Sequence, residues 1–141
     1  MDRKEKQRRA QRYLLALARL ERKCEEAARW ESIAEGSDPG GRSQVKVAAL
    51  HIRAECEDLT RQVQELRGDL MRALEQMQTE RLREVLEWCY LSGRPLSEIC
   101  EQKGWSFRYG YQVRSEALDE LGRVSSYFKD SSQNLKKPEK F

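Results

Sequence analysis

The sequence contains no long apolar run. None of its 141 residues belongs to a continuous apolar stretch of the roughly 18 residues that a transmembrane helix needs. The charged start, MDRKEKQRRAQR, is not followed by the apolar segment of a secretory signal. We therefore expect a cytoplasmic protein that does not bind a membrane.

Histidine and paired cysteines are also scarce. The only histidine is His51, and the four cysteines, Cys24, Cys56, Cys89 and Cys100, form no CxxC pair. A zinc site needs clustered thiolates or imidazoles, so none is expected. The cysteines are interpreted as reduced, small apolar fillers of helix interfaces. No acid–base pair or activated nucleophile is recognisable, so we expect neither an enzyme nor a cofactor, metal or catalytic residue.

Helix breakers are few, and charge is abundant. With three prolines and 36% charged residues, the composition favours long exposed helices. The sequence predicts an all-α fold, in which a coiled-coil-like antiparallel helical hairpin precedes a small three-helix domain of the helix-turn-helix type. The predicted domains are 1–78, with a break at 36–43, and 79–123. A tail at 124–141 lacks periodicity and is expected to be mostly disordered, with a fold-back of its aromatic residues as the alternative.

Two apolar seams define the predicted hairpin. No proline or glycine interrupts residues 4–35, and the second helix keeps a seven-residue repeat from Val45 to Met77, with Ser43 as its N-cap. Folding the chain at Gly40 places the seams face to face, with Cys24 opposite Cys56. The seam residues expected at this interface are Tyr13, Leu17, Leu20, Cys24, Ala27, Ile52, Cys56, Leu59, Val63 and Leu66.

Three apolar residues extend past the partner helix in this hairpin, namely Leu70, Ala73 and Met77. They need cover, since a two-helix hairpin buries little apolar surface. Two explanations remain open. The hairpin forms a homo-oligomer, or the terminal helices fold back over this end.

The segment 79–123 predicts three short helices. Thr79 can cap a first helix that ends at SGRP, and the second begins at Pro95 or Ser97. Gly104 suits the left-handed residue of a tight turn, and Ser106 suits the N-cap of the third helix. The residues expected to face inward are Leu82, Val85, Leu86, Cys89, Tyr90, Leu96, Ile99, Cys100, Val113, Ala117, Leu118 and Leu121.

The third helix, 106–121, is predicted to read double-stranded DNA from its first two turns. Arginine can bind guanine edges and glutamine adenine edges, while tyrosine and serine can bind phosphates. Glu116, Asp119 and Glu120 lie at the far end of this helix and would repel phosphates, so only its first two turns can approach DNA. The outward residues expected at the interface are Arg108, Tyr109, Tyr111, Gln112 and Ser115, with Arg114 on the flank.

The charge distribution bears on this interpretation. Residues 79–123 hold seven basic and eight acidic side chains, whereas residues 1–12 hold six basic and two acidic ones. Non-specific DNA affinity comes mainly from neutralised phosphates, so the basic residues must gather on one face or other parts must supply them. The alternative function is a non-enzymatic structural or adaptor protein whose hairpin binds other proteins.

Short motifs stand out in the last forty residues and, more weakly, in the hairpin. They are 80–83, Ser97, Glu98, Ile99, the turn 104–108, Leu86 and Tyr90, Ala117, Leu118 and Leu121, and in the hairpin Tyr13, Leu14 and the glycine-rich break. At these residues the sequence resembles region four of bacterial sigma factors. It is more similar still to phage and prophage transcriptional regulators of the ArpU/RinA kind, over roughly residues 10–122. It departs from these patterns at Cys100, where alanine is usual, and at Gly110, where a branched apolar residue is usual.

The resemblance implies a sequence-specific regulator of phage or prophage genes. It adds Phe107 to the residues expected to face DNA. It also implies a contact with RNA polymerase, to which sigma region four docks.

Overall fold

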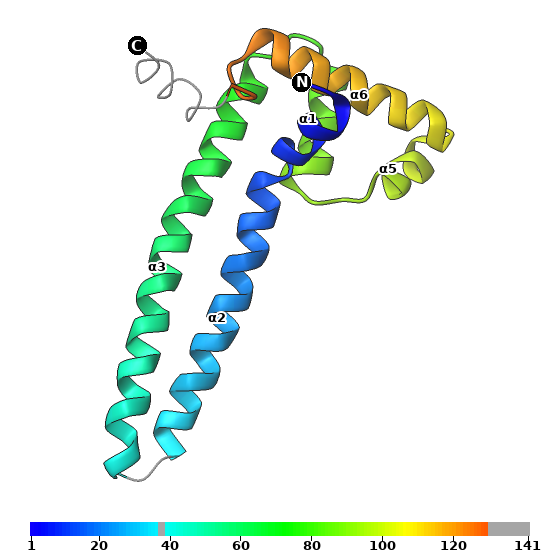
Figure 1. The fold of residues 1–141 in the computed structure, drawn as a ribbon. Coiled ribbons are helices and arrows are strands. Elements are labelled where there is room, and N and C mark those ends of the chain that lie inside the picture. Colours follow the sequence, from blue (N-terminus) through cyan, green and yellow to red (C-terminus); the bar gives the residue numbers. More distant parts are fainter. Residues whose placement is uncertain (37–38, 130–141) are drawn as a thin grey trace, which may run out of the picture. The chain divides into compact units, whose positions relative to one another are not determined.

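The computed structural model describes residues 1–36 and 39–129, and it describes only the backbone of residues 39–43. The described residues are helical and contain no strand, so the all-α prediction is confirmed. The helices are α1 (Arg3–Ala10), α2 (Arg12–Gly36), α3 (Pro39–Glu75), α4 (Glu80–Leu86), the π-helix η1 (Glu87–Leu91), α5 (Leu96–Lys103) and α6 (Phe107–Val124) (Figure 1).

None of the helices in the described ranges combines the length with the apolar character needed to cross a lipid bilayer.

The chain divides into two compact units. The hairpin unit comprises residues 12–67, and the terminal unit combines residues 1–11 with the chain from residue 68 onward. One boundary lies inside α3, between Arg67 and Gly68, and the other lies at the junction of α1 and α2. Each unit has its own buried side chains and is described separately below.

In the hairpin unit, α2 and α3 run antiparallel and side by side (Figure 1). Ala27, Ile52 and Cys56 form a buried apolar cluster, and Leu20 and Trp30 pack against it. Small side chains at the centre allow the two backbones to approach, while the larger ones close the edges. The seam therefore brings together residues that are far apart in the sequence.

Ion pairs join the same two helices outside the seam. Lys23 of α2 lies 3.1 Å from Glu55 of α3, and Arg53 pairs with Glu31. These side chains are substantially exposed, so solvent screens the pairs and each contributes little to stability. Their main effect is to favour one alignment of the helices, because a shifted alignment would separate the charges.

The burial of the predicted seam is uneven. Leu17, Leu20 and Leu66 are half-buried, and Cys24 is exposed, so it does not fill the interface as expected. Its thiol nevertheless acts on that of Cys56, whose pKa is raised first by burial and then by Cys24. The seam residues that are buried are Tyr13, Ala27, Ile52, Cys56, Leu59 and Val63.

Two predicted features of these helices are wrong. The helix expected over 4–35 is interrupted at Gln11, whose backbone leaves the regular helical conformation (φ −84°, ψ −2°) because α1 packs with the terminal unit. Ser43 is not an N-cap, because α3 already begins at Pro39. Proline suits the first helical position, where its missing N–H has no partner to lose and its ring fixes φ.

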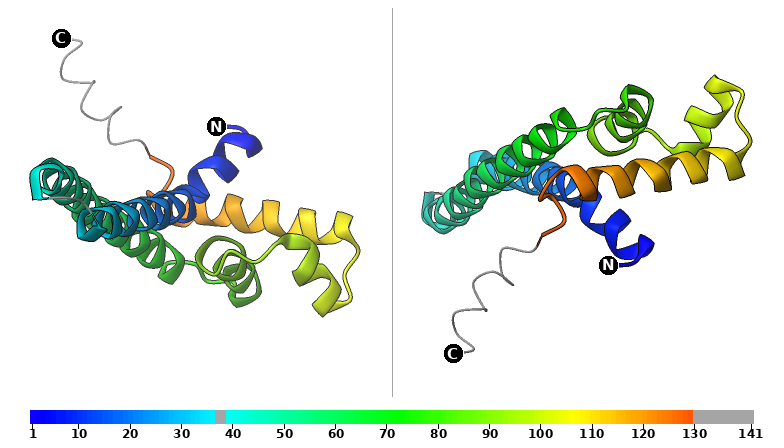
Figure 2. Two further views of the ribbon diagram at one scale, coloured as in Figure 1. Left: turned by 90° about the horizontal axis from the view of Figure 1, so that it is seen from below. Right: turned by 90° about the horizontal axis from the view of Figure 1, so that it is seen from above.

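The terminal unit is built around α6. Helices α4 and α5 pack against one side of α6, and α1 lies on the opposite side (Figure 2). Leu70, Ala73 and Met77, which needed cover, are buried in this unit. The largest fully buried side chains of the unit are Leu70, Val85, Leu86, Ile99, Val113 and Leu121.

The chain folds back after α6. Disorder was predicted from residue 124, but Tyr127 and Phe128 are buried, as in the fold-back alternative. The Arg9 guanidinium donates to the carbonyl oxygen of Phe128 over 2.7 Å, and the Tyr127 hydroxyl donates to the carbonyl oxygen of Arg9 over 3.3 Å. These bonds attach α1 to the segment that follows α6 in the sequence. The rest of the predicted tail, 130–141, lies outside the described residues.

Candidate nucleic-acid interface

The start of α6 is set by the turn that precedes it. Gly104 adopts the left-handed conformation (φ 70°, ψ 27°) in which a glycine has no steric cost. The Trp105 amide then donates to the Cys100 carbonyl over 2.9 Å, which closes the end of α5. Ser106 caps α6, because its hydroxyl oxygen accepts from the Tyr109 amide over 3.1 Å. Both roles predicted for this turn, those of Gly104 and Ser106, are present.

Close packing between α5 and α6 depends on Gly110. A Cβ atom at this position would lie 2.2 Å from the Sγ atom of Cys100, and 3.7 and 3.8 Å from Leu96 and Trp105. Such a distance to sulfur is far below any van der Waals contact. The two departures from the sigma-factor pattern therefore lie against each other, with the larger side chain of Cys100 filling the space that Gly110 leaves.

The exposed residues among those predicted to face DNA lie in the first turns of α6. Phe107 is exposed at 59%, whereas Arg114 and Ser115 are half-buried. Arg114 lies over the Tyr111 ring at 5.1 Å, so its guanidinium is held on the flank of the helix. The members of the set that are exposed are Phe107, Arg108, Tyr109, Tyr111 and Gln112.

Helix α1 adds a second element to this surface. Lys6 forms an ion pair with Asp119 at 3.0 Å, and Arg3 lies at the rim of a hollow on the outer face of α6. The hollow has a volume of about 370 Å³. The α6 residues that line it are Arg108, Tyr111, Gln112, Ser115, Glu116 and Asp119. The basic start of the chain and the predicted reading residues therefore share one surface.

Glu120 was expected to repel phosphates from the far end of the third helix, but its carboxylate is not available to solvent. Its side chain is buried, with 6% of its surface exposed, and it accepts from the backbone amides of Gln78 and Thr79 over 3.1 and 3.2 Å. The Thr79 hydroxyl donates to the second carboxylate oxygen over 2.6 Å. These bonds, led by the one from the hydroxyl, lower the pKa of Glu120 against the opposing effect of burial.

Thr79 itself does not cap α4 with its side chain. It occupies the N-cap position, but its hydroxyl is used by Glu120. Glu120 of α6 therefore holds the two residues before α4, Gln78 and Thr79, from a distant part of the sequence, without capping the amides of α4 itself. Sequence spacing could not reveal this, because the helical repeat places Glu120 at the border between the inner and outer faces.

Sequence reasoning also missed a cationic cluster around Trp88. The Lys103 ammonium lies 4.9 Å from the centre of the indole ring, and the Arg94 guanidinium lies 5.7 Å from it. Arg94 is held by Glu98, whose carboxylate accepts from its Nε over 3.1 Å. The cluster joins η1 to α5. The sequence carries one signal for this cluster, namely two basic residues that follow the tryptophan within about fifteen positions.

The chain matches no protein-family model, and neither a curated protein nor a solved structure matches it significantly. The similarity to phage regulators stays a prediction from the residues quoted above.

Proposed function

We propose that the protein is a sequence-specific DNA-binding regulator that reads duplex DNA with the first turns of α6. The observation that carries this proposal is the position of α1. The terminal unit's three-helix part is nearly neutral, but the most basic segment of the chain lies against the outer face of α6. Phosphate contacts supply most non-specific affinity, and α1 provides the charges for them.

In this proposal the two elements have different tasks. Arg108 and Gln112 are the side chains suited to base edges, because they can form paired hydrogen bonds with guanine and adenine. The exposed cations of α1, Arg3 and Arg8 among them, bind phosphates beside the groove. Lys6 neutralises Asp119, which would otherwise repel the phosphate backbone.

The wider role rests on the family resemblance. As a regulator of the ArpU/RinA kind, the protein would act in the bacterial cytoplasm on phage or prophage promoters. A contact with RNA polymerase belongs to the same proposal. Whether transcription rises or falls depends on where the bound protein sits relative to the polymerase.

The test begins with DNA selected from a random duplex library by the full-length chain. On the selected duplex, Arg108→Ala together with Gln112→Ala should cost about 1–3 kcal/mol of binding free energy per lost base contact. The same double variant should relax sequence preference, because base-edge contacts specify sequence. No enrichment in the selection would contradict the proposal.

The contribution of α1 is tested through salt dependence. Arg3→Ala with Arg8→Ala should weaken binding to all duplexes and reduce the slope of log K against log salt by about one per lost phosphate contact. The matched control is Arg19→Ala with Arg29→Ala, which removes two exposed arginines from the hairpin unit. Equal slopes for the two double variants would exclude α1 from the interface.

A second candidate function, an adaptor working through the hairpin, is favoured by the exposed apolar side chains of α3. Val47 and Leu50 are exposed at 67% and 70%. If the selection yields no DNA sequence while this surface binds protein, the adaptor function is the better account.

A further inference from the structure

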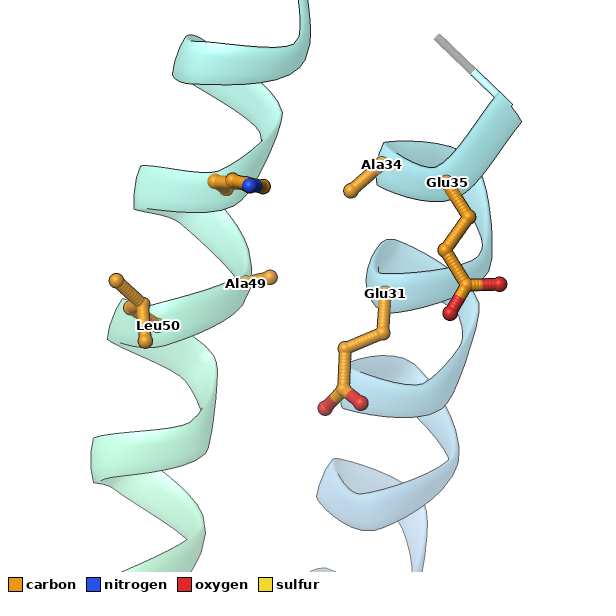
Figure 3. Close-up of a pocket in the computed structure, with 6 residues that line it drawn as sticks. Glu31, Ala34, Glu35, Ala49 and Leu50 are labelled. Atoms are coloured by element: carbon orange, nitrogen blue, oxygen red, sulfur yellow. The ribbon is translucent and has the colours of Figure 1, made fainter.

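An open groove lies between α2 and α3 of the hairpin unit, near the end of α2 and the start of α3. The buried alanines Ala34 and Ala49 form its floor and point toward one another across the gap (Figure 3). Because both side chains are small, they leave a hollow of about 540 Å³ between α2 and α3. The groove lies entirely within the hairpin unit.

Large apolar side chains stand beside this groove without cover. Leu50 forms one edge and points away from α2, and Val47 precedes it by one helical turn (Figure 3). They are the two most exposed large apolar residues among those that the structure describes. A neighbouring pair of this kind, next to a concave apolar floor, is typical of a contact surface.

The charges around the groove are arranged in a self-complementary way. Glu31 and Glu35 line it from α2 (Figure 3). Lys46 lines it from α3. Within the described residues, Glu31 pairs with Arg53, whereas Glu35 and Lys46 have no ion pair. One acidic and one basic side chain thus remain available on opposite walls.

We propose that this groove binds a second copy of the chain. In a two-fold symmetric contact the same surface meets itself, so residue i of one copy touches residue j of the other and the reverse. Leu50 of each copy then enters the alanine-floored groove of its partner. Lys46 of each copy meets the partner's Glu35, which forms two equivalent ion pairs around the apolar centre.

The chain's own charges favour this occupant over an unrelated protein. A partner that is purely acidic or purely basic would meet one favourable wall and one repulsive wall. A second copy offers both signs in matching positions. The proposal concerns the hairpin unit alone and does not depend on DNA binding.

The first test measures the mass of the full-length chain in solution without DNA, by sedimentation equilibrium. We expect a dimer at concentrations on the order of 100 μM, and a monomer for Leu50→Asp. Leu15→Asp is the matched control, since Leu15 is an exposed leucine (57%) of α2 that does not line the groove. Its mass should equal that of the wild type, and circular dichroism should show unchanged helicity for both variants.

The second test exchanges the charges between copies. Lys46→Glu alone and Glu35→Lys alone should each be largely monomeric, because each homodimer would place like charges together. An equimolar mixture of the two variants should recover the dimer, since every cross-pair is then attractive. Recovery in the mixture requires that positions 35 and 46 meet across the interface.

Several outcomes would overturn the proposal. They are a wild-type protein that stays monomeric, a dimer that persists in Leu50→Asp, and a mixture of charge variants that does not recover the dimer. A loss of mass in Leu15→Asp equal to that in Leu50→Asp would likewise place the interface elsewhere on the hairpin.

Discussion

Gly110 and Cys100 form a matched pair at the crossing of α5 and α6, where a Cβ atom on Gly110 would lie 2.2 Å from the cysteine sulfur. Neither residue can be understood alone. A glycine in a helix interior costs about 1 kcal/mol relative to alanine, so its presence here needs a reason in the packing. The sulfur of Cys100 is that reason.

The first prediction is that Gly110→Ala has opposite effects on stability in the wild type and in a Cys100→Ala variant. In the wild type, Gly110→Ala should destabilise the protein by about 1–3 kcal/mol, as overpacking of a close contact does. In a Cys100→Ala background the same substitution should be neutral or stabilising by up to about 1 kcal/mol, because helix propensity then decides. Urea unfolding of the four proteins measures the coupling, and additive effects would show that the two residues do not interact.

The second prediction concerns Glu120. Glu120→Gln should lower the free energy of unfolding by about 1–3 kcal/mol, since the bonds from Gln78 and Thr79 lose their charged acceptor. Glu116→Gln, an exposed glutamate on the same helix, should change stability by less than about 0.5 kcal/mol. Equal losses in the two variants would show that the bonds from Gln78 and Thr79 to Glu120 do not stabilise the fold.

The third prediction is the pH dependence that follows from the same carboxylate. The pKa of Glu120 in the folded state lies below its ordinary value of 4.5, so the folded state binds its proton less readily than the unfolded chain does. The contribution of Glu120 to the free energy of unfolding is therefore complete above the pKa that it has in the unfolded chain. This contribution is lost as the pH falls through the lower pKa of the folded state. Unfolding measured from pH 7 downward should show a weaker acid dependence in Glu120→Gln than in the wild type.

The fourth prediction concerns the C-terminal fold-back. Phe128 is buried, and its ring lies 3.0 Å from the position that a Cβ atom on Gly122 would occupy. Phe128→Ala should cost about 3 kcal/mol and should speed hydrogen exchange in α1, which is bonded to the same segment. Phe107→Ala, at a phenylalanine exposed at 59%, is the control and should have little effect on either measurement.

The fifth prediction separates the cysteines by reactivity. Cys24 is exposed, whereas burial, followed by the hydrogen bond from Cys24, raises the pKa of the Cys56 thiol. Burial also raises the pKa of Cys89. The thiolate is the reactive form, so iodoacetamide near neutral pH should modify Cys24 first. Mass spectrometry should find one fast modification that Cys24→Ser abolishes, and two fast modifications would contradict this order.

The sequence was most informative where a single periodic pattern controlled the outcome. The apolar repeat placed Val113, Ala117 and Leu121 on the inner side of α6, and all three are buried. Local chemistry was sufficient at Gly104 and Ser106, because a left-handed turn and an N-cap each depend on one residue and its neighbours. The all-helical fold follows from the same kind of information.

Contacts between segments that are far apart in the sequence could not be predicted from periodicity or local chemistry. Periodicity leaves a residue such as Glu120, at the border of two faces, free to lie on either. The helix breaks at Gln11 although no glycine or proline stands there. We attribute the break to the packing of α1 against α6, which local sequence does not encode. Sequence alone determined the helices and their inner faces, because these depend on neighbours along the chain. Tertiary structure decided that the basic first helix lies on the face proposed to read DNA, because only folding brings residues 3–9 beside residues 108–119.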